Sequence, residues 1–151
     1  MKLINPKKSL GQNFLIDKNI SRKIVNLTKI FNKKILEIGP GTGSLTDEII
    51  KLKPNKLILI EKDDKICKEL KLKYNKINFV SIINADILMF DIDKLNIDSI
   101  ISNLPYNISI KLILKVLISN NLIDDLVFMI QKEVADKLNY KKIIKNNRLK
   151  F

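Results

Sequence analysis

Short apolar runs alternate along the chain with segments whose apolar residues recur at helical spacing. The runs have the length of buried strands and cover 34–38, 56–60, 77–83, 99–102 and 126–130. The segments with helical spacing cover 17–27, 44–52, 64–73, 110–117 and 132–138. Strands that are apolar on both faces and alternate with helices are typical of a parallel, doubly wound sheet. The pattern therefore predicts an α/β fold.

Turn and capping residues mark where several of these elements begin. Asp17 is a good N-cap for the first helix, in which Ile20, Ile24 and Leu27 are spaced to share one face. Glycines and a proline over 39–43 predict a tight turn between the first strand and the second helix. In folds of this class, ligands bind beyond the carboxyl ends of the strands. We therefore expect functional residues directly after each strand.

The composition indicates one folded domain. The chain has 151 residues, of which 46% are hydrophobic and 29% charged, with only four glycines and four prolines. Such a composition is not that of a disordered chain. The apolar runs are too short to cross a membrane, and Pro6 interrupts the N-terminus before the apolar core of a signal peptide. These features predict a cytoplasmic location with no membrane partner.

The chain carries an excess of basic residues. Its 28 lysines and arginines exceed its 16 aspartates and glutamates by 28 − 16 = 12 charges. A strongly basic protein favours a polyanionic partner such as a nucleic acid, because lysines near phosphates release condensed counterions. The other interpretation is compositional, since a sequence rich in Lys, Asn and Ile is what an AT-rich genome encodes. Charge by itself leaves both interpretations open.

The residue types that the chain lacks restrict its chemistry. It has no histidine, and Cys67 is its single cysteine. Nucleophilic schemes built on Ser–His or Cys–His pairs are thereby excluded, as are an internal disulfide and a metal site of the usual ligand set. We predict no metal and no role for Cys67. Any reaction has to use carboxylates, amides, backbone groups or a cofactor.

Glycines and acidic residues follow the first three strands. Gly39-Pro-Gly-Thr-Gly43 leaves the first strand, Glu61 ends the second, and Asp86 follows the third. Glycines let a ligand lie against the main chain, and an acid about 20 residues later can hold ribose hydroxyls. Each feature alone also fits a plain turn or a helix cap. Together they predict an adenosine-containing cofactor, with Asp86 accepting a hydrogen bond from the adenine amino group.

The glycine spacing helps to choose between cofactors. Nicotinamide cofactors favour G-x-G-x-x-G, with a pyrophosphate at the helix N-terminus. Here the spacing is G-x-G-x-G, and the acidic Glu37 precedes it. This arrangement is better suited to a cofactor with a cationic sulfonium and an amino-acid tail than to a diphosphate.

Asn103-Leu-Pro-Tyr106 follows the fourth strand and faces the same edge. One interpretation is a proline-terminated loop with a surface tyrosine. The functional interpretation is methylation of an aromatic amine, whose two N–H bonds the Asn103 side-chain carbonyl and the Leu104 backbone carbonyl accept. Pro105 keeps Leu104 extended, and Tyr106 offers a ring for a flipped-out base to stack on. Because the methylated nitrogen loses its proton readily, the scheme needs no histidine.

Six short motifs occur in order along the chain. They are Ser9-Leu-Gly-Gln-Asn-Phe-Leu15, Glu37-Ile-Gly-Pro-Gly-Thr-Gly-Ser-Leu-Thr46, Ile60-Glu61, Ala85-Asp86, Asn103-Leu-Pro-Tyr-Asn-Ile-Ser109 and Phe128-Met-Ile-Gln-Lys-Glu-Val-Ala-Asp136. With these motifs the chain resembles a known family, the ribosomal RNA adenine dimethyltransferases. The resemblance extends from Lys8 to the end of the chain. It implies a Rossmann-like methyltransferase fold that binds S-adenosylmethionine. The residues that it assigns to the cofactor are Asn13, Leu15, Gly39, Glu61, Asp86 and Asn103.

The resemblance also implies a substrate. Family members transfer two methyl groups to the N6 nitrogen of each target adenosine. One branch modifies two adjacent adenosines near the 3′ end of small-subunit ribosomal RNA and assists ribosome assembly. The other modifies large-subunit RNA and confers macrolide resistance, and it tends to carry isoleucine in place of Leu104 and serine in place of Gly11. The residues present favour the small-subunit branch. We expect the chain to act as a monomer. Mitochondrial transcription-factor relatives resemble it more distantly.

The chain departs from the family pattern at its C-terminus. Family members continue through further strands and a helical domain that helps to dock RNA, whereas this sequence stops at Phe151. We expect one methyltransferase domain over 1–151, with an N-terminal motif segment 8–30, a core 34–138 and an incomplete end 139–151. The last strand of the core should then form a sheet edge. The alternative to an enzyme is a non-catalytic module for RNA binding or ribosome assembly.

Overall fold

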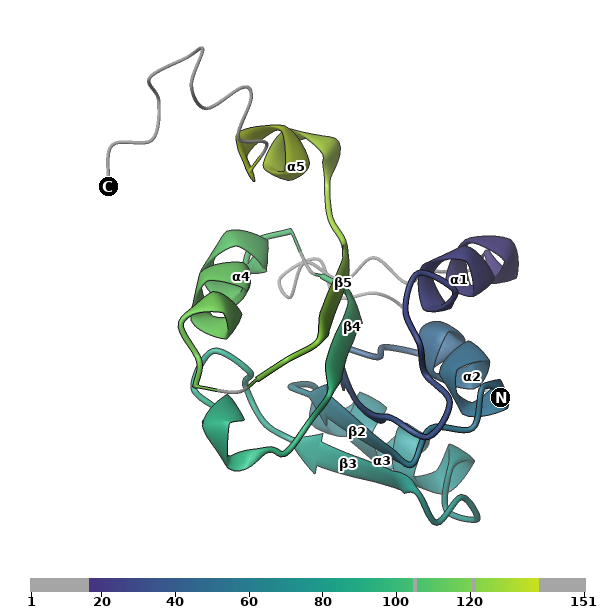
Figure 1. Ribbon diagram of the computed structural model, residues 1–151. Coiled ribbons are helices and arrows are strands. Elements are labelled where there is room, and N and C mark those ends of the chain that lie inside the picture. The colour runs from purple at the N-terminus through teal and green to yellow at the C-terminus, as the bar shows by residue number, and fades with distance from the viewer. Residues whose placement is uncertain (1–16, 105, 121, 139–151) are drawn as a thin grey trace.

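A single five-stranded parallel sheet forms the centre of the molecule. The computed structural model describes residues 17–104, 106–120 and 122–138. The sheet has the strand order β3-β2-β1-β4-β5, with every neighbouring pair parallel (Figure 1). The strands are β1 (Lys34–Ile38), β2 (Lys56–Glu61), β3 (Val80–Asn84), β4 (Ser99–Asn103) and β5 (Asp125–Met129). The α/β, doubly wound fold predicted from the apolar pattern is thereby confirmed.

Helices precede, connect and follow the strands, and two of them begin after an aspartate that caps the helix. They are α1 (Lys18–Val25), α2 (Ser44–Lys51), α3 (Asp64–Lys73), η2 (Ile92–Lys94, a 3₁₀ turn), α4 (Ser109–Leu117) and α5 (Lys132–Leu138). The Asp17 carboxylate caps α1 by accepting a hydrogen bond from the Asn19 backbone N–H at 2.7 Å. Asp63 caps α3 in the same way, with the Lys65 N–H 2.9 Å away.

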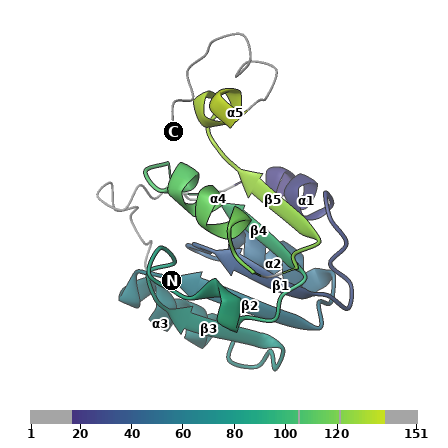
Figure 2. The same cartoon turned by 60° about the vertical axis from the view of Figure 1, so that its left-hand side comes forward.

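Two apolar layers cover the two faces of the sheet. Helices α1, α2 and α3 pack on one face through side chains such as Ile24, Ile49 and Leu70. Helix α4 and the η2 turn pack on the other face through Leu112 and Ile92 (Figures 1 and 2). The reason is handedness: the chain crosses the sheet in opposite directions from β1 to β2 and from β4 to β5. Right-handed crossovers then place their helices on opposite faces.

The third strand is shorter than the apolar run predicts. That run begins at Ile77, whereas β3 begins at Val80. Ile77 N–H donates to the Tyr74 carbonyl at 3.0 Å, and Val80 N–H donates to the Ile77 carbonyl at 3.1 Å. The run therefore starts inside the turn that follows α3. Apolar side chains there pack on the core without belonging to the strand.

The first helix also ends earlier than its apolar spacing suggests. Helix α1 stops at Val25, and Asn26 follows as its C-cap. Leu27, expected on the buried face, lies in the next turn with 72% of its surface exposed, and Ile20 is 40% exposed. Only Ile24 of the three predicted positions is buried. The packing of α1 against α2 thus uses Ile24 and Val25 rather than the longer stripe.

Among the described strands, β5 lies at the outer edge of the sheet and pairs only with β4. Its Leu126 side chain is 37% exposed. The expectation that the fifth strand forms an edge is met within these residues. Of the helices that the structure describes, none combines the length and apolar character needed to span a membrane.

Candidate functional site

The residues singled out after the strands meet at one edge of the sheet. Strands β3, β2, β1 and β4 are neighbours and parallel, so their carboxyl ends lie side by side. In the register of β1 and β4, Glu37 pairs with Ile101. Gly39 and Asn103 lie two residues further along the chain from these two partners. The Ser102 hydroxyl joins the same two strand ends by donating to the Ile38 carbonyl. The glycine loop and the Asn103 motif are therefore next to each other.

The loop over 39–43 is a tight turn, as its glycines predict. Gly39, Gly41 and Gly43 have φ values of 64°, 55° and 84°, in the left-handed region that favours glycine. Gly39 N–H donates to the Ile60 carbonyl of β2 at 2.9 Å, and Gly43 N–H donates to the Pro40 carbonyl at 2.9 Å. The loop then leads into α2 with no side-chain N-cap.

Glu61 joins the end of β2 to the glycine loop. Its side chain is nearly buried, with 6% of the residue exposed. Oε1 accepts the Asp63 backbone N–H at 2.9 Å, and Oε2 accepts the Gly41 N–H at 3.4 Å. Burial raises the pKa of the Glu61 carboxyl above its ordinary value. The carboxylate is thus held by backbone groups at the base of the loop, close to any ligand that the loop binds.

Cys67 lies behind this strand end and takes no part in the site's surface. It is 1% exposed, and its thiol donates to the Glu61 backbone carbonyl at 3.3 Å. The same carbonyl accepts the Asn84 side-chain N–H at 3.0 Å. Burial raises the pKa of the Cys67 thiol, which keeps it protonated. These contacts fit the prediction that Cys67 has no chemical role.

Glu37, the acid that precedes the glycine loop, is buried, with 1% of the residue exposed. Its Oε2 accepts the Thr46 hydroxyl of α2 at 2.7 Å. Burial raises the pKa of the Glu37 carboxyl from 4.5 to about 8, against the opposing effect of the Thr46 hydrogen bond. Glu37 therefore supports the loop and α2 from inside as a mostly neutral acid at pH 7.

Asp86 stands in the turn after β3. Its Oδ1 accepts the Leu88 backbone N–H at 3.0 Å, and its Oδ2 lies 2.8 Å from the Lys62 ammonium. The Lys62 hydrogen bond lowers the pKa of the Asp86 carboxyl. The side chain is 30% exposed. Asp86 is therefore a turn residue, which is one of the two interpretations that its sequence position allows. Its carboxylate also reaches the surface next to Glu61.

The Asn103 motif begins at the last residue of β4. Asn103 is partly buried and pairs with Met129 of β5. Leu104 is 1% exposed, and its N–H donates to the Met129 carbonyl at 3.1 Å. Tyr106 is 44% exposed, and its backbone carbonyl accepts the Ser109 hydroxyl at 3.2 Å as α4 begins. The motif therefore has a buried residue, Leu104, and a partly exposed tyrosine, Tyr106, within three positions of Asn103.

Three of the predicted site residues lie outside the described part of the chain: Asn13, Leu15 and Pro105. Their roles stay predictions. Within the described ranges, His, Cys, Asp and Glu side chains form no group of three or more that could hold a metal ion.

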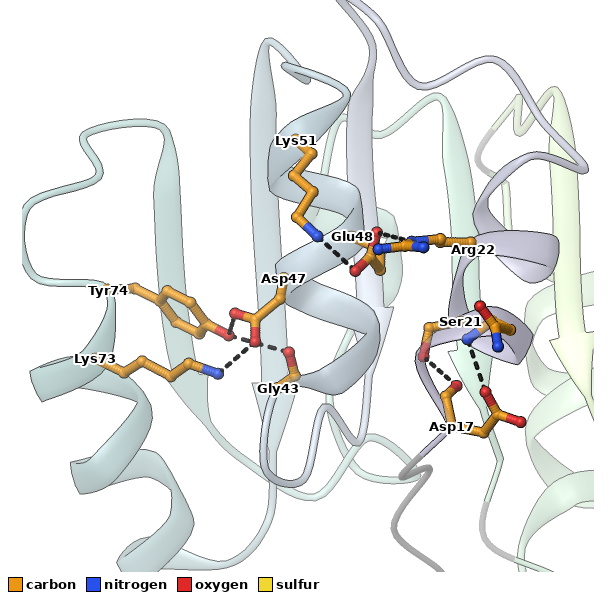
Figure 3. A network of polar contacts seen from close by, with 10 residues as sticks. Asp17, Ser21, Arg22, Gly43, Asp47, Glu48, Lys51, Lys73 and Tyr74 are labelled. Carbon is orange, nitrogen blue, oxygen red and sulfur yellow. Dashed lines mark hydrogen bonds and ion pairs between the residues drawn. The ribbon is translucent and has the colours of Figure 1, made fainter. Parts of the chain in front are cut away.

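The structure adds one set of residues to the site that the motifs do not indicate. Lys73 and Tyr74, at the end of α3, reach the last two residues of the glycine loop and Asp47 of α2 (Figure 3). No sequence signal points to this contact, because the partners are about thirty positions apart and a Lys-Tyr pair at the end of a helix is unremarkable in itself.

Comparison with known proteins identifies the relatives of this fold and site. A sequence profile described as "Ribosomal RNA adenine dimethylase" matches residues 4–148. Two curated proteins named "Ribosomal RNA small subunit methyltransferase A" are similar in sequence. The one from Pelagibacter ubique is 48% identical over 140 residues, covering 89% of this chain and 53% of that protein. The one from Borreliella afzelii is 44% identical over 147 residues, covering 96% and 52%.

A solved structure shows the same arrangement of strands and helices. It is a dimethyladenosine transferase from Plasmodium falciparum, 31% identical, with a TM-score of 0.75 over 83% of this chain and 46% of that one. The fold is therefore the Rossmann-like methyltransferase fold. The chain spans about half the length of the curated relatives that it matches. Because the family profile covers nearly all of its residues, the chain belongs to the ribosomal RNA adenine dimethylase family.

Proposed function

We propose that this chain carries the cofactor-binding and methyl-transfer core of a small-subunit ribosomal RNA adenine N6,N6-dimethyltransferase. Its substrate is the pair of adjacent adenosines near the 3′ end of the RNA, and its partner is the immature small ribosomal subunit. Both curated relatives described above carry the small-subunit name. The net charge of +12 suits a polyanionic substrate.

One observation carries the proposal. Neighbouring strands β1 and β4 bring the glycine loop level with Asn103, since Glu37 and Ile101 are register partners. A methyl donor on the loop and an amine held by Asn103 would then be adjacent. Transfer to an amine requires this proximity above all, because the nitrogen, the methyl carbon and the leaving sulfur have to lie in line.

The residues at the strand ends suit S-adenosylmethionine. Backbone at Gly39 offers the close approach that a ligand needs. Each Glu61 carboxylate oxygen accepts one backbone N–H and keeps a lone pair for a ribose hydroxyl. Asp86 lies next along the edge, where it can accept the adenine amino group. Asn13, Leu15 and Asn103 complete the proposed cofactor set by resemblance.

The chain's own groups would prepare the adenine amine. The nitrogen lone pair is delocalised into the ring, so the amine is a poor nucleophile. The Asn103 side-chain carbonyl and the Leu104 backbone carbonyl accept its two N–H bonds and turn the lone pair toward the methyl donor. When bound, S-adenosylmethionine would supply an electrophilic methyl group in exchange for its bond to sulfur, and the methylated nitrogen would release its proton to water. Tyr106 holds the flipped-out base by stacking.

Incubating the chain with methyl-labelled S-adenosylmethionine and immature small subunits tests the function. We expect label in N6-methylated adenosine near the 3′ end of the small-subunit RNA. Large subunits from the same cells serve as the matched substrate, and label confined to them would favour the macrolide-resistance type. Cofactor binding without label in either RNA would favour a non-catalytic assembly module.

Replacing Glu61 with glutamine is expected to weaken S-adenosylmethionine binding by about tenfold or more, because hydrogen bonds to a charged acceptor are lost. Isothermal titration calorimetry gives the dissociation constant, and a thermal melt shows whether the variant folds. Glu69→Gln, an exposed position on α3, is the matched control and should bind normally. Equal affinity of the two variants would remove Glu61 from the cofactor site.

Replacing Tyr106 with alanine is expected to reduce kcat/KM for RNA by about tenfold to a hundredfold, the range typical of one lost base–aromatic stack. Tyr106→Phe keeps the ring and should retain most activity. Neither change should alter the dissociation constant of S-adenosylmethionine, since the exposed ring lies on the substrate side. A phenylalanine variant as inactive as the alanine variant would show that the hydroxyl, not stacking, matters.

A further inference from the structure

The last turn of α3 contacts the glycine loop through two side chains. The Tyr74 hydroxyl lies 2.7 Å from Asp47 Oδ1 and 3.2 Å from the Gly43 carbonyl oxygen. The Lys73 ammonium lies 2.8 Å from Asp47 Oδ2 (Figure 3). It also lies 3.2 Å from the Thr42 carbonyl oxygen. We use the name loop clamp for Lys73, Tyr74 and Asp47. Two consecutive carbonyls of the loop therefore receive donors from one helix end.

The clamp is fitted closely to the backbone of Gly43. A Cβ atom at this position would lie 2.2 Å from the Tyr74 hydroxyl oxygen and 3.1 Å from the Lys73 ammonium. Gly43 also has a φ of 84°, which side-chain-bearing residues rarely adopt. Glycine at position 43 thus allows the backbone of the turn to adopt its conformation and leaves space for the side chains at the end of α3. The Tyr74 hydroxyl rests against the main chain just where the loop becomes a helix.

The three clamp side chains reinforce one another. Asp47 lies in the first turn of α2, where its charge suits the helix N-terminus that Gly43 leaves without a side-chain cap. Lys73 also lies over the Tyr74 ring, 5.0 Å from its centre. Burial, with Asp47 as the next cause, raises the pKa of the Tyr74 phenol well above its usual range. The hydroxyl therefore stays a donor across the physiological pH range.

The two ends of the loop are held by different elements. Glu61 and the Ile60 carbonyl hold its first part from the end of β2. The clamp holds its second part from the end of α3. Since β2 leads directly into α3, a single stretch of chain fastens both halves of the loop. A loop held in its binding conformation before the ligand arrives binds more tightly, because less conformational entropy is lost.

We propose that Tyr74 and Lys73 act with Asp47 as positioning residues that preorganise the glycine loop and so set the affinity for S-adenosylmethionine. This inference rests on the proposed function for the identity of the ligand. The competing explanation is purely structural: the same contacts tie α3 to α2 and stabilise the fold without changing the loop. The two explanations differ in what they predict for ligand affinity and for motion of the loop.

The test compares Tyr74→Phe and Lys73→Met with a matched control on the same helix. The control is Lys68→Met, which removes an exposed ion pair with Asp64 at 2.7 Å in place of a contact with the loop. Calorimetry gives the dissociation constant of S-adenosylmethionine for each variant. Amide hydrogen exchange of the peptide over 39–47, without cofactor, reports the loop itself. Thermal melts report stability separately.

Each clamp variant is expected to weaken binding by about fivefold to tenfold, because a loop that is no longer held loses more conformational entropy when the ligand binds. Exchange in the loop should become faster, while Lys68→Met should match the unchanged chain in both measurements. At saturating cofactor, kcat should change less than KM for S-adenosylmethionine. Lys73→Arg, which keeps the charge, should restore much of the affinity.

The proposal would be overturned if the clamp variants melted at lower temperatures but kept the affinity for S-adenosylmethionine and the hydrogen exchange of the loop unchanged. The clamp would then only stabilise the packing of α3 against α2. If Tyr74→Phe does not fold, Lys73→Met still decides, because the Lys73 side chain is partly exposed and its replacement removes only contacts within the clamp and with the loop. If the unchanged chain binds no S-adenosylmethionine, the proposed function fails. The exchange comparison would still decide whether the clamp holds the loop.

Discussion

Replacing Asn103 with alanine is expected to abolish methyl transfer while the affinity for S-adenosylmethionine stays within about tenfold, or about 1.4 kcal/mol. The side-chain carbonyl at this position is proposed to accept one N–H of the target amine and expose its lone pair. Alanine removes that acceptor and leaves the strand intact. Because Asn103 is the last residue of β4 and only partly buried, the substitution should not disturb the core.

Two measurements and one control check this result. Single-turnover methylation of immature small subunits gives the rate, and calorimetry gives the dissociation constant for the cofactor. Asn55→Ala is the matched control, since Asn55 is exposed at the start of β2, at the opposite end of the sheet. It should leave both values unchanged. Undiminished methylation by Asn103→Ala would refute the proposed mechanism.

Stability is expected to fall between pH 5 and pH 8 through Glu37. In the folded chain, burial raises the pKa of this carboxyl from 4.5 to about 8. At pH values between these two, the folded state keeps the proton while the unfolded state has lost it. The free energy of unfolding therefore decreases as pH rises, by roughly 1.4 kcal/mol per pH unit for one such group. The contribution is complete below pH 4.5 and lost above about pH 8.

Glu37→Gln isolates this contribution. A neutral amide can still accept the Thr46 hydroxyl and has nearly the same volume, but it does not titrate. Urea unfolding at pH 5, 6.5 and 8 should show a smaller pH dependence for this variant than for the unchanged chain. Glu69→Gln, at an exposed position, should behave like the unchanged chain. Parallel pH profiles for all three proteins would mean that Glu37 ionises normally in the folded state.

Several elements of the fold follow from local sequence signals. The first strand, 34–38, and the third helix, 64–73, match their predicted bounds because glycine, aspartate and proline mark their ends. The errors occur where apolar residues continue past the end of an element. Ile77 lies in a turn and Leu27 lies beyond a helix C-cap. Apolar character reports that a residue packs on the core, and it does not report which backbone conformation brings it there.

The candidate site likewise contains residues whose position could be predicted from the sequence and one whose surroundings could not. Gly39, Glu61, Asp86 and Asn103 could be predicted to lie together because each ends a strand or follows one within two residues, and parallel strands place their ends along one edge. The burial of Glu37 and its hydrogen bond with Thr46 could not be predicted, since a place at the end of a strand does not reveal which side chains cover it. Its shifted pKa comes from that burial.

The amino-acid sequence by itself determined the α/β class and the order of the candidate site residues, because periodicity and turn chemistry act over a few neighbouring positions. It also indicated the family, through the resemblance carried by six ordered motifs. Only the tertiary structure decided that Tyr74 and Lys73 meet the glycine loop, about thirty positions earlier in the chain. That contact depends on α3 packing beside α2 on one face of the sheet. Such packing is set by the volumes and directions of many side chains at once, and no local pattern records it.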